Sequence, residues 1–93
     1  MLEKRFGLEP AFKRPNDVLV EGKKICGVLV EAKGLSNGEL ESLVIGIGLN
    51  VNASSREMVP GATSLMEETG RKQPRSAILG ALLTQLNRDL RRL

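Results

Sequence analysis

The chain contains no histidine, no tryptophan and no tyrosine, and it has a single cysteine, Cys26. Without histidine, serine–histidine and cysteine–histidine catalysis are excluded within these 93 residues. One cysteine cannot form an intramolecular disulfide, and it offers too few ligands for a zinc site. We therefore expect Cys26, which lies between Ile25 and Gly27, to be a buried and chemically inert side chain.

Aromatic side chains are also scarce, since Phe6 and Phe12 are the only two. The core must therefore be built from aliphatic residues, and the 41% apolar content is that of a globular chain. No apolar run reaches the roughly 18 residues that a membrane-spanning helix needs. The first residues lack the apolar stretch of a signal peptide, so the expected compartment is the cytoplasm, with no membrane partner.

The net charge of +3 is unevenly distributed. Residues 71–93 carry six basic side chains and one acidic side chain. This pattern is typical of a solvated helix face, although a basic tail also suits an anionic partner. The aromatic residues that single-stranded nucleic-acid binders place between basic groups are missing, which argues against a nucleic-acid partner.

Residues 13–31 predict a β-hairpin on which the rest of the chain is organised. Its strands are expected at residues 17–21 and 24–33, joined by a turn at Glu21-Gly22, because glycine adopts positive φ without penalty. The second strand is apolar on both faces, so we expect it to be central and covered on both sides.

A third strand is predicted at residues 40–52, where large apolar residues alternate with small ones. One face carries Gly46, Gly48 and Asn50. A sheet face without bulky side chains can accept a flat ligand, or it can accept a closely packed helix. Both interpretations remain open at this stage.

Helices are expected after the strands. Ser64 has the capping-box spacing to Glu67, and a helix of leucines at helical spacing follows at residues 76–93. Residues 1–12 predict a helical turn that runs into a loop. The predicted fold class is therefore α+β, a three-stranded antiparallel meander followed by two helices.

Three stretches resemble the biotin protein ligases, in the order that this family shows. They are Lys13-Arg14-Pro15-Asn16-Asp17 with Lys24 and Gly27-Val28-Leu29-Val30-Glu31, then Val44–Asn52, then Ala62-Thr63-Ser64-Leu65. Arg14 departs from the pattern, because the family usually has tryptophan there. The resemblance implies that residues 1–93 form part of the biotin/lipoyl protein ligase catalytic fold, with the upstream half and a C-terminal barrel-like domain absent.

The resemblance also implies an activity. Biotin protein ligases join biotin and ATP, with Mg²⁺, to give biotinyl-AMP and pyrophosphate. They then transfer the biotinyl group to a lysine of a biotin carboxyl carrier protein, such as that of acetyl-CoA carboxylase. Because half of the site is missing, we expect the isolated chain to be weakly active or inactive, and its incomplete sheet to self-associate.

The family roles map onto individual residues of this chain. Lys24 matches the lysine that reaches the biotin carboxylate and the acyl phosphate, and Asp17 with Asn16 matches the pair near the triphosphate and the reacting centre. The resemblance thus implies Lys24 and Asp17 as the catalytic residues. Asn16 is also the expected oxygen ligand of magnesium. From the residues alone, Lys24 is better explained as an exposed lysine at the start of a strand, and Asn16-Asp17 could form a turn that leads into a strand. The biotin- and nucleotide-binding positions that the resemblance implies are Asn16, Gly27, Val28, Leu29, Gly46, Gly48 and Asn50.

Two other functions remain open. A non-catalytic module could keep the fold and bind a partner by strand addition or through its basic helix. A lipoyl or octanoyl transferase relative is the other alternative, although the run from Gly27 to Glu31 resembles the biotin branch.

Overall fold

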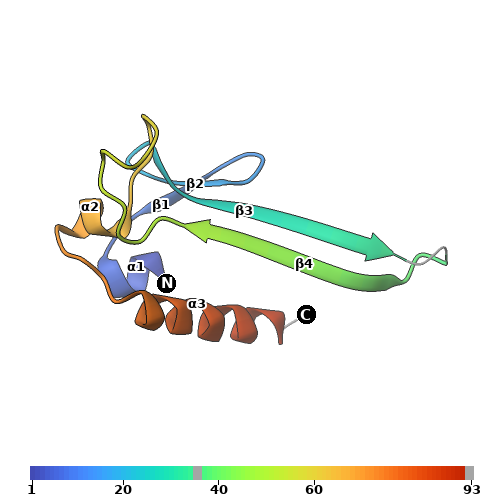
Figure 1. The fold of residues 1–93 in the computed structure, drawn as a ribbon. Coiled ribbons are helices and arrows are strands. Elements are labelled where there is room, and N and C mark those ends of the chain that lie inside the picture. The colour runs from blue at the N-terminus through green and yellow to red at the C-terminus, as the bar shows by residue number, and fades with distance from the viewer. Residues whose placement is uncertain (35–36, 92–93) are drawn as a thin grey trace.

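The computed structural model describes residues 1–34 and 37–91. The elements are α1 (Leu2–Phe6), β1 (Pro10–Lys13), β2 (Asp17–Val20), β3 (Lys23–Gly34), β4 (Leu40–Leu49), α2 (Leu65–Thr69) and α3 (Arg75–Leu90). The strands form one antiparallel sheet in the order β1-β2-β3-β4. Figure 1 shows β3 and β4 as a long hairpin that extends away from α1 and α2, with α3 running beneath it. The α+β prediction is confirmed.

The sheet has four strands rather than the three that the sequence predicts. The sequence predicts a helical turn that runs into a loop over residues 1–12, but residues 10–13 form β1, which pairs with β2 from Pro10 opposite Val20 to Lys13 opposite Asp17. Proline, alanine and lysine are depleted in strands, so three of the four residues of β1 give no strand signal in the sequence. Pro10 is compatible with this position, because it is the first residue of an edge strand.

The turn between β2 and β3 is confirmed. Glu21 and Gly22 both have positive φ, 50° and 78°, which matches the twist of a tight hairpin. The register shifts between Val18 and Leu19, which pair with Cys26 and Lys24. Ile25 is the extra residue of this irregularity, and it is fully buried.

β4 ends at Leu49, earlier than the predicted strand at residues 40–52. Beyond Leu49, the Asn50 amide donates to the Ile25 carbonyl, and residues 50–52 then leave the sheet. Residues 35–36 of the expected loop between the strands lie outside the described residues. The β3–β4 register places Gly27 opposite Gly48 and Leu29 opposite Gly46.

The core is small and lies at the start of β3. Its buried apolar members come from the sheet and from two helices, and they are Val20, Ile25, Cys26, Leu65 and Ile78. Farther along β3, Leu29 and Val30 are 55% and 54% exposed. The prediction of a strand covered on both faces is therefore wrong beyond residue 28, because no described segment packs there.

The helices begin close to where the sequence predicts. The Glu67 amide donates to Ser64 Oγ over 3.2 Å, and Gly70 ends α2 with a φ of 74°. α3 follows Pro74 and buries Ile78, but Leu79 and Leu83 remain more than half exposed. Residues 92–93 of the predicted final helix lie outside the described part of the chain. Within the described ranges, no helix has the length and apolar character needed to cross a bilayer.

Candidate functional site

The site has a floor of sheet backbone that carries no side chains at Gly27, Gly46 and Gly48. In the sheet register, Gly27 lies between Asp17 on β2 and Gly48 on β4. A Cβ atom at Gly46 or Gly48 would have no neighbour closer than 3.8 Å, so the space above these two glycines is open. Because side chains alternate between faces, the paired Gly27 and Gly48 leave the same face of the sheet bare.

These glycines form the bottom of a surface depression of about 530 Å³. The residues that line it are Pro15, Asn16, Asp17, Lys24, Gly27, Val28, Leu29, Gly46, Ile47 and Gly48. The structure thus brings together all of the predicted site residues except Asn50. Pro15 and Ile47 were not predicted. The sequence could have indicated these two residues only through their neighbours, since each is adjacent to a predicted site residue.

Lys24 and Asp17 form an ion pair within the depression, with 3.0 Å between Lys24 Nζ and Asp17 Oδ1. The lysine side chain reaches the aspartate by passing over Gly27, where its Nζ would lie only 3.4 Å from a Cβ atom. Both side chains keep contact with solvent, at 49% and 28% exposure. The pair therefore holds an ammonium over the glycine floor while leaving it accessible to an anionic ligand.

The segment that carries Asn16 is held against β3 by its backbone. The Val28 amide donates to the Asn16 carbonyl over 2.8 Å, while the Asn16 side chain is exposed at the rim of the depression. Arg14, the departure from the family pattern, lines a neighbouring hollow of about 300 Å³ with Phe12 and Val30. Its cation is therefore beside the depression and does not line it.

Asn50 lies outside the lining of the depression. Its Nδ2 donates to the Thr63 carbonyl over 3.1 Å, and its own carbonyl accepts from the Leu65 amide over 3.0 Å. The structure thus gives Asn50 contacts with the segment that returns after β4. Thr63 is a buried polar residue that the sequence did not single out as part of a site.

Cys26 is buried, as the sequence predicts. Burial raises the pKa of its thiol above the ordinary value of 9.0, and the nearby positive charge of Lys24 opposes this only in part. Since the thiolate is the reactive form, a raised pKa keeps the thiol unreactive near neutral pH.

Oxygen ligands for a magnesium ion are present but few. Among the described residues, no group of three or more acidic, histidine or cysteine side chains could hold a metal. Asn16 and Asp17 place one amide and one carboxylate at the depression. Magnesium usually takes one or two protein oxygens and completes its shell with water and substrate phosphate, so this donor set fits it.

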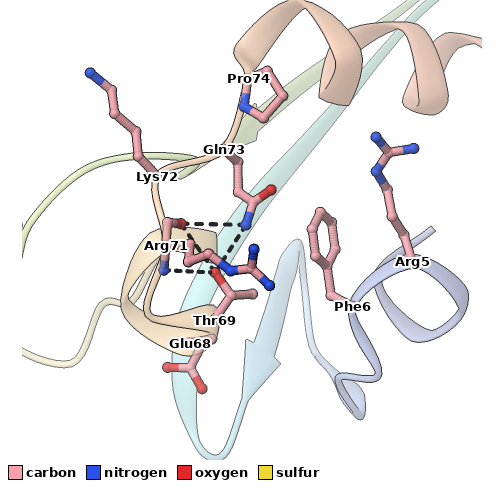
Figure 2. A pocket seen from close by; sticks show the side chains of 8 residues that line it. All are labelled: Arg5, Phe6, Glu68, Thr69, Arg71, Lys72, Gln73 and Pro74. Atoms are coloured by element: carbon pink, nitrogen blue, oxygen red, sulfur yellow. Dashed lines mark hydrogen bonds between the residues drawn. The ribbon is translucent and has the colours of Figure 1, made fainter.

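A second hollow, of about 660 Å³, lies between α1, the end of α2 and the start of α3 (Figure 2). Its lining residues are Arg5, Phe6, Glu68, Thr69, Arg71, Lys72, Gln73 and Pro74. Several of its polar groups bond to one another, as when Gln73 Nε2 donates to Thr69 Oγ1 and to the Arg71 carbonyl. It contains none of the predicted site residues.

Comparison with known proteins identifies the family. The sequence profile of the Biotin/lipoate A/B protein ligase family matches residues 4–50. The bifunctional ligase/repressor BirA of Bacillus spizizenii is 36% identical over 86 residues, covering 88% of this chain and 26% of that protein. The biotin--[acetyl-CoA-carboxylase] ligase of Mycobacterium tuberculosis is 37% identical over 78 residues, covering 84% and 27%.

Solved structures agree. The biotin protein ligase of Aquifex aeolicus in complex with biotin and ATP superposes with a TM-score of 0.74 at 36% identity, over 97% of this chain and 37% of that one. The same enzyme in another crystal structure gives a TM-score of 0.75 over 98% and 40%. This chain thus spans about a quarter of the length of its curated relatives. Since the profile covers half of the chain and the fold agrees, the protein belongs to the biotin/lipoate A/B protein ligase family and is similar within it to the biotin protein ligases.

Proposed function

We propose that this chain supplies one wall of a site that joins biotin to ATP and passes the biotinyl group to a lysine of a carrier protein. The observation that carries the proposal is the depression itself, where Lys24 stands over Gly27 beside Asp17. Eight of the nine site residues expected from the sequence line it. Support comes from the family and from the Aquifex aeolicus enzyme, which was crystallised with biotin and ATP.

In the first step, a biotin carboxylate oxygen attacks the α-phosphorus of ATP, and the bond to pyrophosphate breaks. Negative charge then builds on the acyl phosphate oxygens. The Lys24 ammonium is positioned to neutralise that charge, as preorganised cations do in other acyl and phosphoryl transfers. The bare backbone at Gly27, Gly46 and Gly48 gives the ligand room to lie flat against the sheet.

In the second step, the lysine amine of the acceptor attacks the acyl carbon, and AMP leaves. We propose a biotin carboxyl carrier protein as the acceptor and the cytoplasm as the place of reaction. Asn16 and Asp17 would hold a magnesium ion, which supplies charge neutralisation at the phosphates when it is bound. The depression is open to solvent, so the isolated chain has little to protect an adenylate from water.

Calorimetric titration with a hydrolysis-resistant biotinyl-AMP analogue tests the site without requiring turnover. We expect weak binding, and amide chemical-shift changes confined to the residues lining the depression. Lys24→Gln should weaken binding by about tenfold or more, because it removes a charge-assisted contact. Lys23→Gln is the matched control, since Lys23 is an adjacent exposed lysine outside the depression.

Shift changes that map only to the second hollow, or equal effects of the two lysine variants, would refute the proposed site. Competition decides between branches of the family: a lipoyl-AMP analogue that binds more tightly than the biotinyl one would assign the chain to the lipoyl branch. Incubation with biotin, Mg-ATP and an acceptor domain then measures transfer, which we expect to be weak or absent for the chain alone.

A non-catalytic binding module is the second candidate, and the observation that favours it is the edge of the sheet. Within the described ranges β4 pairs with β3 on one side only, and Val44 on this strand is 59% exposed. An open edge strand can accept a further strand from another chain. A partner strand that protects β4 amides from exchange, with no effect of the biotinyl-AMP analogue, would favour this candidate.

A further inference from the structure

We infer that Thr63 is a positioning residue that determines where the Lys24 side chain lies over Gly27. The inference rests on the proposed function for the role of Lys24, but the geometry that carries it can be measured without a ligand. Its basis is a hydrogen-bond junction in which a buried threonine joins three separate elements.

Thr63 is 2% exposed, and all three of its polar groups are used. Its amide donates to the Lys24 carbonyl over 2.8 Å, and its carbonyl accepts from Asn50 Nδ2 over 3.1 Å. Its hydroxyl donates to the Glu68 carboxylate, Oε2, over 2.5 Å. Thr63 therefore links β3, the segment after β4 and helix α2. Burying these groups is favourable only because each has a partner.

The backbone of Lys24 depends on this junction. β4 pairs with β3 only as far as Cys26, opposite Leu49. Toward the start of β3, residues 61–63 occupy the position that β4 would take beside it. Ala62 forms a parallel bridge with Lys24, and the Lys24 amide donates to the Gly61 carbonyl over 2.8 Å. Both main-chain groups of Lys24 are thus held by residues 61–63, which belong to no regular strand of the sheet.

The side chain of Lys24 has little else to direct it. It is half exposed, and among the described residues its one ion pair is with Asp17. Its path over Gly27 leaves only 3.4 Å between Nζ and a Cβ position, so a small displacement of its backbone changes where the ammonium sits. The Thr63 hydroxyl and Glu68 are consequently expected to control the site from outside the depression, which neither residue lines.

Nuclear magnetic resonance of the 93-residue chain tests the inference. In the wild type we expect a nuclear Overhauser effect between the Lys24 ε-protons and the Gly27 α-protons, and slow exchange of the Lys24 and Thr63 amides. Thr63→Val, which keeps the shape and removes the hydroxyl, should weaken that effect. It should also accelerate exchange of both amides by about tenfold, the equivalent of one lost hydrogen bond. Thr63→Ser should restore both readouts.

Two further variants separate positioning from general stability. Glu68→Leu removes the same hydrogen bond from a partly exposed residue, so it carries the test if Thr63→Val does not fold. Thr69→Val is the control, because its hydroxyl donates within α2 to the Leu65 carbonyl and does not touch the junction. Thr69→Val should leave the Lys24–Gly27 nuclear Overhauser effect unchanged. The distant Leu29–Gly46 pairing should be unchanged in every variant.

An unchanged Lys24–Gly27 effect in folded Thr63→Val and Glu68→Leu would overturn the inference, and so would its absence from the wild type. A ligand arm adds the functional consequence: the biotinyl-AMP analogue should bind the two variants about tenfold more weakly. If the analogue fails to bind the wild type, the proposed function fails, while the ligand-free readouts still decide the positioning role.

Discussion

At the scale of single residues, the depression depends on what is missing from three positions. Because Gly27 has no Cβ atom, the Lys24 side chain can pass over it. Because Gly46 and Gly48 have none, the space above the sheet stays open. These glycines do not have positive φ, so their backbone could accept a side chain. Their absence of a Cβ atom therefore serves the site and not the conformation of the strand.

Gly48→Ala separates those two roles. A Cβ atom there would lie 3.9 Å from the Gly27 carbonyl oxygen, an ordinary contact, and alanine in a strand is favoured over glycine by about 0.5–1 kcal/mol. We expect stability in urea to be unchanged or higher, while the affinity for a biotinyl-AMP analogue falls. Gly80→Ala, in an open position on α3, should stabilise without changing affinity. A Gly48→Ala protein that binds normally would contradict this role.

Cys26 gives a prediction about pH. Burial raises the pKa of its thiol above 9.0 in the folded state, so the unfolded chain loses this proton at lower pH than the folded one. The contribution of Cys26 to stability should be complete below pH 9.0 and should decline as the pH rises further. Urea unfolding between pH 7 and 10.5 should show a steeper loss for the wild type than for Cys26→Ala. Equal slopes would show that the thiol is not protected by burial.

At the scale of elements, the chain places its site by means of a short helix and the segment before it. α2 has only five residues, too few to be stable alone, so its ends and its contacts determine whether it forms. Ser64 is fully buried and uses its hydroxyl twice, accepting from the Glu67 amide and donating to the Ala53 carbonyl over 2.7 Å. The same helix carries Glu68, which holds Thr63.

Ser64→Ala should therefore cost about 1–2 kcal/mol, the upper range for loss of a helix N-cap. Besides the cap, the variant leaves the Ala53 carbonyl without its donor. The urea midpoint of the variant measures the effect. Ser76→Ala is the matched control, because Ser76 is an exposed serine in the first turn of α3. Similar midpoints for the two variants would show that the cap is not needed.

At the scale of the whole molecule, the shape is extended, with axial extents of 50, 26 and 20 Å. The β3–β4 hairpin extends away from α1 and α2 (Figure 1). The buried core lies at the start of β3, whereas apolar side chains farther along the hairpin, such as Leu29, Val30 and Val44, are more than half exposed. Among the described residues, no strand pairs with the outer edge of β4. Natural proteins rarely leave a long apolar edge strand uncovered, because it invites pairing with another chain.

We therefore expect the chain to self-associate in a concentration-dependent way, measured by sedimentation velocity. Val44→Lys, on β4 and 59% exposed, should shift the chain toward monomer, because a charge on an edge strand opposes pairing. Val59→Lys is the control: Val59 is 75% exposed but lies in the loop before Ala62. A wild type that stays monomeric at all concentrations, or an equal effect of the two variants, would contradict edge pairing.

The sequence by itself determined the local features of this protein. Its β-hairpin with a Glu21-Gly22 turn, the glycines of β4 and the Ser64 cap are visible in residue types, because each needs a particular side chain or none. The sequence also indicated the family, through motifs whose spacing is preserved. It missed β1, since three of its four residues are poor strand formers and pairing with β2 is what defines the strand.

Only the tertiary structure decided which of these features meet. It placed Asp17, Lys24 and Gly48 around one depression through sheet register, which a sequence does not display. It put Asn50 outside that depression and revealed Thr63 as a junction, because hydrogen bonds between distant segments depend on how the chain returns after β4. Apolar pattern alone predicted a strand covered on both faces. Coverage depends on what packs against the strand, and the described residues leave most of β3 open.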